Sequence, residues 1–213
     1  RTLAMTVYAD LDTSIIDELP PGRTPITTVV ISEERRDEIV QRVKNACVNE
    51  KRQAYWVCTL IDESEVLEAQ AAEAIWDDLT KALPMLKIGL VHGRMKPQEK
   101  QEVMLQFKNA ELDLLVATTV IEVGVDVSNA SLMIIENAER LGLSQLHQLR
   151  GRVGRGSTAS FCVLMYKPPL GKVSQKRLQV LRDSQDGFVI SEKDLEIRGP
   201  GEVLGTKQTG IME

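Results

Sequence analysis

The stretch "LDLLVATT" (residues 112–119) is a nearly unbroken apolar run with a single charged residue. Such a run is typical of a strand that helices cover on both faces, as in a parallel sheet. Five other segments have the same character: "ITTVVIS" (26–32), "AYWVCTL" (54–60), "KIGLVHG" (87–93), "LMIIEN" (132–137) and "ASFCVLMY" (159–166). Together they predict six strands of a mostly parallel central sheet.

Helical patterns with start signals lie between these strands. Ser32 precedes two glutamates, which are favourable in a first helical turn. Asp62 and Glu65 have the spacing of a capping box, and Pro97 suits the first turn of a helix that runs through Phe107. The alternation of strands and helices predicts an α/β fold built of βαβ units.

Two segments rich in Pro and Gly divide the chain: "ELPPGRTP" (18–25) indicates a linker, and "YKPPLGK" (166–172) closes the last strand. We expect three parts, which are the tail of a preceding domain with its linker (1–22), the α/β domain (23–166) and a C-terminal helical hairpin with a following loop (167–213). Because the chain has no initiator Met, we expect it to be a fragment of a longer polypeptide.

The composition suits one sizeable core, since 43% of the 213 residues are hydrophobic. There is no apolar run of about 18 residues and no signal-like start, so we expect a cytoplasmic protein without a membrane segment. Cys47, Cys58 and Cys162 are far apart and lie in or beside apolar runs, which predicts buried free thiols. His92 and His147 stand at no usual metal spacing from them, so we expect no zinc.

Positive charge is concentrated in residues 140–182, which include nine Lys or Arg residues and no Asp or Glu. This segment carries +9, so the rest of a chain of net charge −5 carries −14. The asymmetry indicates either a local polyanion site on an acidic body or a solvated basic face. The count alone does not distinguish the two.

The densest part of this segment is "QLHQLRGRVGRG" (145–156). At about 100° per residue, Gln148, Arg152 and Arg155 fall on one face of a helix. Three apolar residues fall on the opposite face: Leu146, Leu149 and Val153. Because planar guanidinium groups match phosphate oxygens, the pattern predicts a helix through Arg155 that packs on the sheet and presents one Gln and two Arg side chains to a phosphate.

Two glycines interrupt this predicted helix. Gly151 and Gly154 would each cost about 1 kcal/mol in a helix interior relative to Ala. We therefore interpret them as positions where a ligand or another domain approaches the backbone closely. The alternative is a surface helix with two solvated arginines.

Candidate ligand contacts also follow the third and fourth predicted strands. In "ATTVIEVGVDV" (117–127), Thr118 and Thr119 could donate to phosphates, and Asp126 after Gly124 could bind a ribose hydroxyl. In "VHGRM" (91–95), three residues could meet a nucleic-acid backbone: His92, Gly93 and Arg94. Taken alone, either segment could equally be an ordinary turn.

In this order, these three segments resemble the late motifs of superfamily 2 helicases, and Q-x-x-G-R-x-G-R at residues 148–155 is highly specific. "RTLAM" (1–5) is similar to the end of the preceding motor domain, and "DGFVISEKDLEIRGPGEVLGTKQTG" (186–210) resembles the translocation motif of RecG-type helicases and transcription–repair coupling factors. The sequence of other segments along the chain is more similar to the RecG type than to the coupling factors. The resemblance implies a RecA-like three-layer domain followed by a helical hairpin.

The resemblance also implies a role for each candidate residue. Arg155 would be the arginine finger, Arg152 would contact the same phosphate, and Gln148 would orient the nucleotide or the attacking water. Gly124 and Asp126 would meet the nucleotide, and the remaining five would contact DNA: His92, Gly93, Arg94, Thr118 and Thr119. In the hairpin and its loop, Arg177, Arg198 and Gln208 would couple the motor to translocation. Ser191 and Asp194 suggest a cap for the second helix of the hairpin.

ATP and Mg²⁺ would be held mainly by a first motor domain that this chain does not contain, since no G-x-x-x-x-G-K-[ST] motif occurs in it. The implied partners are branched or duplex DNA, the upstream motor and wedge domains of the same polypeptide, and a single-stranded-DNA-binding protein. Two alternatives stay open: a motor of a transcription–repair coupling translocase, and a nucleotide-independent module that binds nucleic acid or protein.

Overall fold

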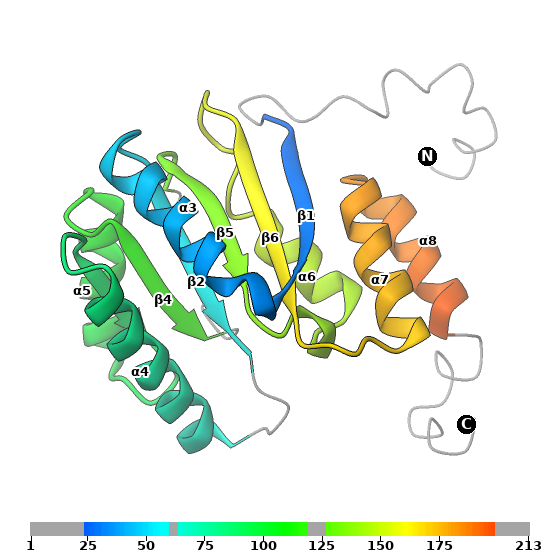
Figure 1. Cartoon of the computed structure of the whole chain (residues 1–213), viewed down its shortest axis with the longest axis horizontal. Coiled ribbons are helices and arrows are strands. Elements are labelled where there is room, and N and C mark those ends of the chain that lie inside the picture. Colours follow the sequence, from blue (N-terminus) through cyan, green and yellow to red (C-terminus); the bar gives the residue numbers. More distant parts are fainter. Residues whose placement is uncertain (1–23, 60–63, 119–126, 199–213) are drawn as a thin grey trace.

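A computed structural model describes residues 24–59, 64–118 and 127–198 and has a six-stranded sheet at its centre (Figure 1). The strand order is β1-β6-β5-β2-β4-β3, and all five neighbouring pairs are parallel. The strands are β1 (Ile26–Ser32), β2 (Gln53–Cys58), β3 (Ile88–Val91), β4 (Leu114–Thr118), β5 (Ala130–Ile135) and β6 (Ser160–Tyr166). The predicted α/β fold with a parallel sheet is confirmed, and each strand lies within two residues of its predicted start and end.

The helices between and after the strands are α3 (Arg36–Val48), α4 (Glu65–Ala82), α5 (Pro97–Lys108), α6 (Leu143–Arg150), α7 (Lys172–Asp183) and α8 (Gly187–Arg198). Two short 3-10 helices, η1 (Glu33–Arg35) and η2 (Ala138–Arg140), follow β1 and β5. Within the described ranges, no helix is long and apolar enough to cross a membrane.

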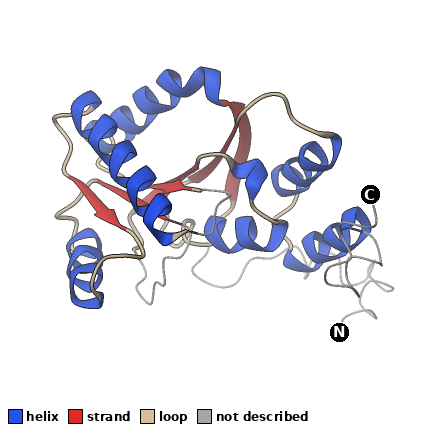
Figure 2. Ribbon diagram, turned by 90° about the horizontal axis from the view of Figure 1, so that it is seen from below, coloured by secondary structure: helices blue, strands red, loops and turns tan. Residues whose placement is uncertain are grey.

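Alternating side chains of each strand build a separate core on either face of the sheet. In β2, Tyr55 and Val57 pack with residues of α5, α6, α7 and α8, whereas Trp56 and Cys58 pack with residues of α3 and α4. Because strand side chains alternate with a period of two, fully apolar strands can supply both cores. The result is a three-layer arrangement in which helices lie on both sides of the sheet (Figure 2).

Helix start signals were predicted correctly at two of three positions. The Ser32 side chain accepts from the Glu34 N–H at the start of η1, and α5 begins at Pro97. The predicted cap at Asp62 is wrong, because α4 begins at Glu65 and the Ser64 hydroxyl accepts from the Leu67 N–H. Asp62 itself lies outside the described residues.

The last two helices form the predicted hairpin beside β1 (Figure 1). Leu178 and Leu181 of α7 are buried in the core shared with α6, so apolar contacts fix α7 to the α/β domain. The predicted cap at Ser191 and Asp194 is wrong, because both residues lie inside α8. Asp186 precedes α8, and its carboxylate accepts from the Phe188 N–H at 2.9 Å. An Asp there satisfies an otherwise unpaired N–H.

The predicted helix through Arg155 is wrong, since α6 ends at Arg150. The Gly151 N–H still donates to the His147 carbonyl, but Gly154 has a φ of 84°, which interrupts a right-handed helix. A Cβ on Gly154 would lie 2.9 Å from Ile26 Cγ1 of β1. The glycine is therefore required by the backbone conformation and by the neighbouring strand of the same domain, and no external ligand is needed to explain it.

All three cysteines are free and buried, as predicted. Burial raises the pKa of the Cys47 and Cys162 thiols to about 12 and raises the pKa of the Cys58 thiol as well. These thiols stay protonated at neutral pH and contribute to the packing of the two cores.

Candidate functional site

The candidate residues gather at two opposite edges of the sheet. Since all strands are parallel, their carboxyl ends lie along one edge, which we call the carboxyl edge, and their starts lie along the amino edge. His92, Gly93 and Arg94 follow β3, and Thr118 ends β4, so these four lie at the carboxyl edge. Helix α6 then carries the chain back toward the start of β6. The loop after α6, residues 151–156, therefore lies at the amino edge.

Arg152 and Arg155 are held in this loop by contacts with strand starts. The carbonyl of Gly154, between them, accepts from the Thr24 N–H at 2.8 Å and from the Thr24 hydroxyl at 3.3 Å. A Cβ on Gly156 would collide with the Ser128 carbonyl just before β5. Both arginines are half-buried. The loop is thus fixed against the amino edge on both sides, with two guanidinium groups only three residues apart.

Gln148 lies on α6, one turn before the loop, and is exposed. Because the helix ends at Arg150, Gln148 shares no helix face with the two loop arginines, although all three remain within one short segment. Gly124 and Asp126 fall in residues 119–126, outside the described residues. Val127 and Ser128, which follow them in the chain, lie at the amino edge beside Gly156.

Arg150 was not predicted as a site residue, yet it is among the most buried side chains, at 2% exposure. Its Nη1 donates to the Thr28 hydroxyl of β1 at 3.1 Å and to the Leu181 carbonyl of α7, and its Nη2 contacts His147 Nδ1 at 3.2 Å. Burial lowers the pKa of Arg150. This arginine belongs to the basic segment but is not available to a polyanion.

A second unpredicted arginine lies at the amino edge. Arg52 precedes β2, and its Nε donates to the Ser131 hydroxyl at 3.0 Å. Its Nη1 donates to the Thr158 hydroxyl at 2.9 Å, just after the arginine-bearing loop. Burial lowers the pKa of Arg52. No sequence pattern singled out this residue, because its two partners are distant hydroxyls.

At the carboxyl edge, the imidazole of His92 is buried and engaged within the protein. Its Nδ1 accepts from the Arg94 N–H at 3.2 Å, which leaves Nε2 to donate to the Glu73 carboxylate, also at 3.2 Å. The ring therefore shapes the turn rather than projecting from it. The side chain of Arg94 is exposed, and Gly93 is half-buried.

Thr118 is also buried, at 1% exposure, and its hydroxyl has no hydrogen-bond partner among the described residues. The next residue, Thr119, lies outside the described residues. Thr118 therefore marks the point where β4 ends beneath the carboxyl edge, and its side chain is not itself exposed.

A buried carboxylate, that of Glu136, stabilises the carboxyl edge. Glu136, just after β5, accepts from the Trp56 indole N–H and pairs with Arg36 at 3.2 Å. The Arg36 guanidinium also lies 5.3 Å from the centre of the Trp56 ring. Burial raises the pKa of Glu136, and Arg36 opposes that shift. These contacts tie the ends of β2 and β5 to the start of α3.

The hairpin candidates have different environments. Arg198, at the end of α8, forms an ion pair with Asp194 at 2.8 Å, one turn earlier. The Nε of Arg177 in α7 and a carboxylate oxygen of Glu139 in η2 are buried without a hydrogen-bond partner among the described residues. Gln208 lies outside the described residues.

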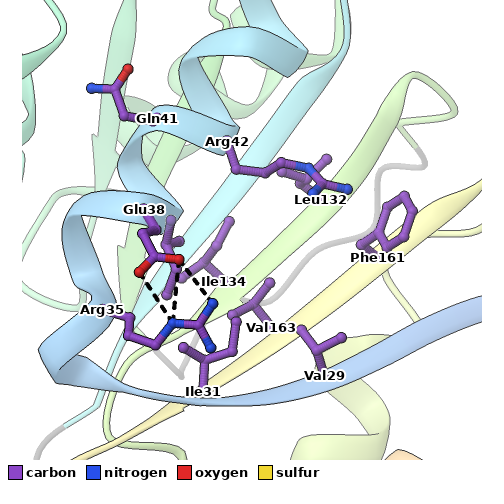
Figure 3. Close-up of a pocket in the computed structure, with 11 residues that line it drawn as sticks. Val29, Ile31, Arg35, Glu38, Gln41, Arg42, Leu132, Ile134, Phe161 and Val163 are labelled. Carbon is purple, nitrogen blue, oxygen red and sulfur yellow. Dashed lines mark hydrogen bonds and ion pairs between the residues drawn. The ribbon is translucent and has the colours of Figure 1, made fainter.

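A groove of about 450 Å³ lies apart from these candidates, between α3 and the sheet (Figure 3). Its floor is apolar, with Val29 of β1 and Phe161 of β6 among the floor residues, and the ion pair between Arg35 and Glu38 lies on the α3 side. Of the predicted site residues that the structure describes, none lines this groove.

Residues 34–157, more than half of the chain, match the family model "Helicase conserved C-terminal domain". The chain is 95% identical over all 213 residues to the ATP-dependent DNA helicase RecG of Haemophilus influenzae and 76% identical to that of Escherichia coli K12, and it spans 31% of the length of each.

Among solved structures, RecG bound to a three-way DNA junction matches with a TM-score of 0.73 and 42% identity, over 95% of this chain and 26% of that chain. The sheet and its helices thus match a RecA-like helicase domain, as the resemblance implied. The chain belongs to the helicase C-terminal domain family, and over its whole length it is nearly identical to the corresponding part of RecG ATP-dependent DNA helicases.

Proposed function

We propose that this chain is the second motor domain, with its translocation hairpin, of an ATP-dependent DNA helicase that acts on branched DNA. The observation that carries this proposal is the 95% identity over the full chain to a RecG helicase. The 42% identity to RecG bound to a three-way DNA junction supports branched DNA as the substrate. In cells, the proposed roles are fork regression and junction branch migration in recombination and DNA repair.

The amino edge is the proposed nucleotide side. The loop that carries Arg152 and Arg155 is fixed by Thr24, and guanidinium groups suit the oxygens of a triphosphate. Arg155 is the proposed arginine finger, which stabilises the charge that develops on the γ-phosphate. Arg152 contacts the same phosphate, and Gln148 orients the nucleotide or the attacking water. Gly124 and Asp126 complete this side by resemblance.

The carboxyl edge is the proposed DNA side. The exposed side chain of Arg94 and the backbone of Gly93 are suited to a DNA phosphate. His92 would act by holding this turn, since its ring accepts from the Arg94 N–H. Thr118 and Thr119 complete the DNA side by resemblance, with backbone contacts at Thr118 because its side chain is buried.

The remaining partners lie in the longer polypeptide. A preceding motor domain would hold ATP and Mg²⁺, and a wedge domain would supply the specificity for junctions. Arg177, Arg198 and Gln208 would pass the closure of the two motor domains to DNA. A single-stranded-DNA-binding protein is a further proposed partner. We place the protein in the cytoplasm because its proposed substrate is the DNA of a bacterial cell, as in the relatives named above.

The test is Arg155→Ala in the full-length protein. Loss of the finger should reduce DNA-stimulated ATP turnover by at least about 10³-fold, because its charge acts on the transition state. The protein should stay folded, since the loop is anchored through its backbone by the Gly154 carbonyl. ATP turnover is measured with a three-way junction, and unfolding is followed by circular dichroism.

Arg182→Ala is the matched control, since Arg182 is an exposed arginine of α7 whose one ion pair within the described part of the chain is with its neighbour Asp183. This control should hydrolyse ATP at the wild-type rate. Residues 1–213 alone should show no DNA-stimulated turnover. If Arg155→Ala left turnover unchanged, the motor assignment would be wrong and a nucleotide-independent binding module would be favoured.

A further inference from the structure

The start of β1, together with Thr24 just before it, contacts two parts of the chain that the proposed function assigns to different tasks. Thr24 holds the arginine-bearing loop through the Gly154 carbonyl at 2.8 Å. The Ile26 N–H donates to the side chain of Gln185, in the junction between α7 and α8, at 3.0 Å. Thr28 accepts from Arg150 at 3.1 Å. One short segment, residues 24–28, therefore supports both the loop and the hairpin.

Arg150 is the residue that contacts all of these parts. It is the last residue of α6, directly before the loop, and its Nη1 donates both to Thr28 of β1 and to the Leu181 carbonyl of α7. The planar guanidinium allows these bonds at one end and a bond to His147 Nδ1 at the other. A guanidinium only donates, so His147 Nδ1 accepts, and the neutral imidazole carries its proton on Nε2.

The environment of Arg150 favours a fixed geometry over a binding role. The side chain is 2% exposed, and its three acceptors are a hydroxyl, a carbonyl and an imidazole, none of which is negatively charged. Burying a cation is unfavourable unless its donors are paired, so each lost bond leaves an unsatisfied donor in the core. The hydrogen bonds of Arg150 to β1 and to α7 therefore oppose any movement of these two elements away from each other.

We propose that Arg150 is a positioning residue that makes the arginine-bearing loop and the α7–α8 hairpin move as one unit on β1. The inference rests on the proposed function, because it assumes that the loop meets ATP and that the hairpin acts on DNA. A displacement of the loop on ATP binding would first move Arg150, which directly precedes the loop. The hydrogen bond from Arg150 to the Leu181 carbonyl would then pass this movement to α7. Without the contacts of Arg150, ATP would still be hydrolysed, but fewer base pairs would be unwound per ATP.

The test is Arg150→Lys in the full-length protein, which keeps the charge but cannot make the forked contacts. DNA-stimulated ATP turnover is measured beside the number of base pairs unwound per ATP at a three-way junction. We expect turnover within about twofold of wild type and unwinding per ATP reduced roughly 2- to 30-fold, the range seen when a coupling contact is removed. The matched control is Arg42→Lys on the opposite face of the sheet, where Arg42 lies over the Phe161 ring, and it should leave both quantities unchanged.

Thr28→Val provides a second, milder variant. Val has nearly the same shape as Thr but removes the hydroxyl that accepts from Arg150, so unwinding per ATP should fall in the same direction and by less. The double variant should lose less than the product of the two single effects, because both changes act on one contact. A melting curve for each variant measures any loss of folded protein.

Three outcomes distinguish the possibilities. If turnover and unwinding fall together in proportion to the unfolded fraction, Arg150 only stabilises the fold and the inference is overturned. If neither changes while wild type is active, Arg150 does not couple the loop to the hairpin, and the proposed function stands alone. If wild type itself shows no DNA-stimulated turnover, the proposed function fails, and this inference fails with it.

Discussion

The end of helix α6 and the loop that follows it place arginines in opposite environments. Arg150, on the helix, is 2% exposed and bonds to β1 and α7. Arg152 and Arg155, two and five residues later, are half-buried in a loop at the amino edge of the sheet. One short motif therefore supplies an internal anchor and two guanidinium groups placed near the surface.

The difference shows why the same residue type serves both purposes. A buried guanidinium needs several fixed acceptors, which makes it a good joint between a helix, a strand and a hairpin. A guanidinium near the surface keeps donors within reach of a phosphate. The helix end at Arg150 separates the two, so changes at the buried apolar positions of α6 should act on stability and changes in the loop should act on chemistry.

Removing core contacts on the anchor side should give the largest loss of stability. Leu146→Ala deletes a fully buried side chain of α6 and should lower the free energy of unfolding by about 2–5 kcal/mol. The loop keeps its own bonds to Thr24, so ATP turnover per folded molecule should stay near wild type. Urea denaturation measures the first quantity, and turnover corrected for the folded fraction measures the second.

Leu105→Ala is the control for this prediction. The same chemical change at a side chain of α5 that is 54% exposed should alter stability by less than about 0.5 kcal/mol. If Leu146→Ala reduced the turnover of folded molecules as strongly as it reduced stability, the proposed division between anchor and loop would not hold.

A smaller effect on stability is expected at the joint between the two regions. Gly154→Ala puts a Cβ at a φ of 84° and 2.9 Å from Ile26, so the free energy of unfolding should fall by about 1–3 kcal/mol. Relief of the clash would move the loop away from β1, and turnover should fall by more than stability alone explains. Unfolding and turnover are measured on the same preparation.

Gly171→Ser serves as the control for Gly154→Ala. A Cβ on Gly171 meets no atom of the described residues within 4 Å, and Gly171 caps α7, where Ser is at least as favourable as Gly. We expect no loss of stability and no change in turnover. Wild-type turnover by Gly154→Ala would show that the loop position does not matter for hydrolysis.

A pattern in the sequence indicates the burial of Arg150, but Arg150 was not predicted as a buried residue. Leu143, Leu146 and Arg150 are separated by three and four residues, so they share one helix face, and the structure buries all three. The spacing of apolar residues continues to Val153. This residue is buried as well, although it lies beyond the end of the helix. Hydrophobic periodicity thus located the packed face correctly and misplaced the helix end.

The strands were predicted well because short apolar runs that are rich in β-branched residues and bounded by turn residues favour a sheet that is covered on both faces. The contacts of His92 could not be predicted, because its ring partner Glu73 lies on another helix and the turn itself fixes the Arg94 N–H. Similarly, no spacing indicates that Arg52 reaches Ser131 and Thr158. Pairs that form only through the tertiary fold leave no local pattern.

The smallest effect tests how well the anchor side excludes water. Cys162 lies on β6 near Arg150, and burial raises the pKa of its thiol from the ordinary value of 9.0 to about 12. Between pH 9 and 12 the unfolded chain therefore releases this proton while the folded chain keeps it, so stability falls as the pH rises. The contribution of this one thiol should reach roughly 1 kcal/mol by pH 10.

Lys and Tyr side chains also titrate between pH 9 and 12. The test therefore compares the slope of unfolding free energy against pH in wild type with the slope in Cys162→Ala. Below about pH 8, Cys162→Ala should lower stability by a constant amount, for the cavity it leaves. Above pH 9 the variant should have a slope flatter by one proton, so its difference from wild type shrinks as the pH rises. An unchanged slope would mean that Cys162 ionises as easily in the folded protein as in the unfolded chain. Water would then reach β6 beneath Arg150, and the contrast between a dry anchor and a more accessible loop would be lost.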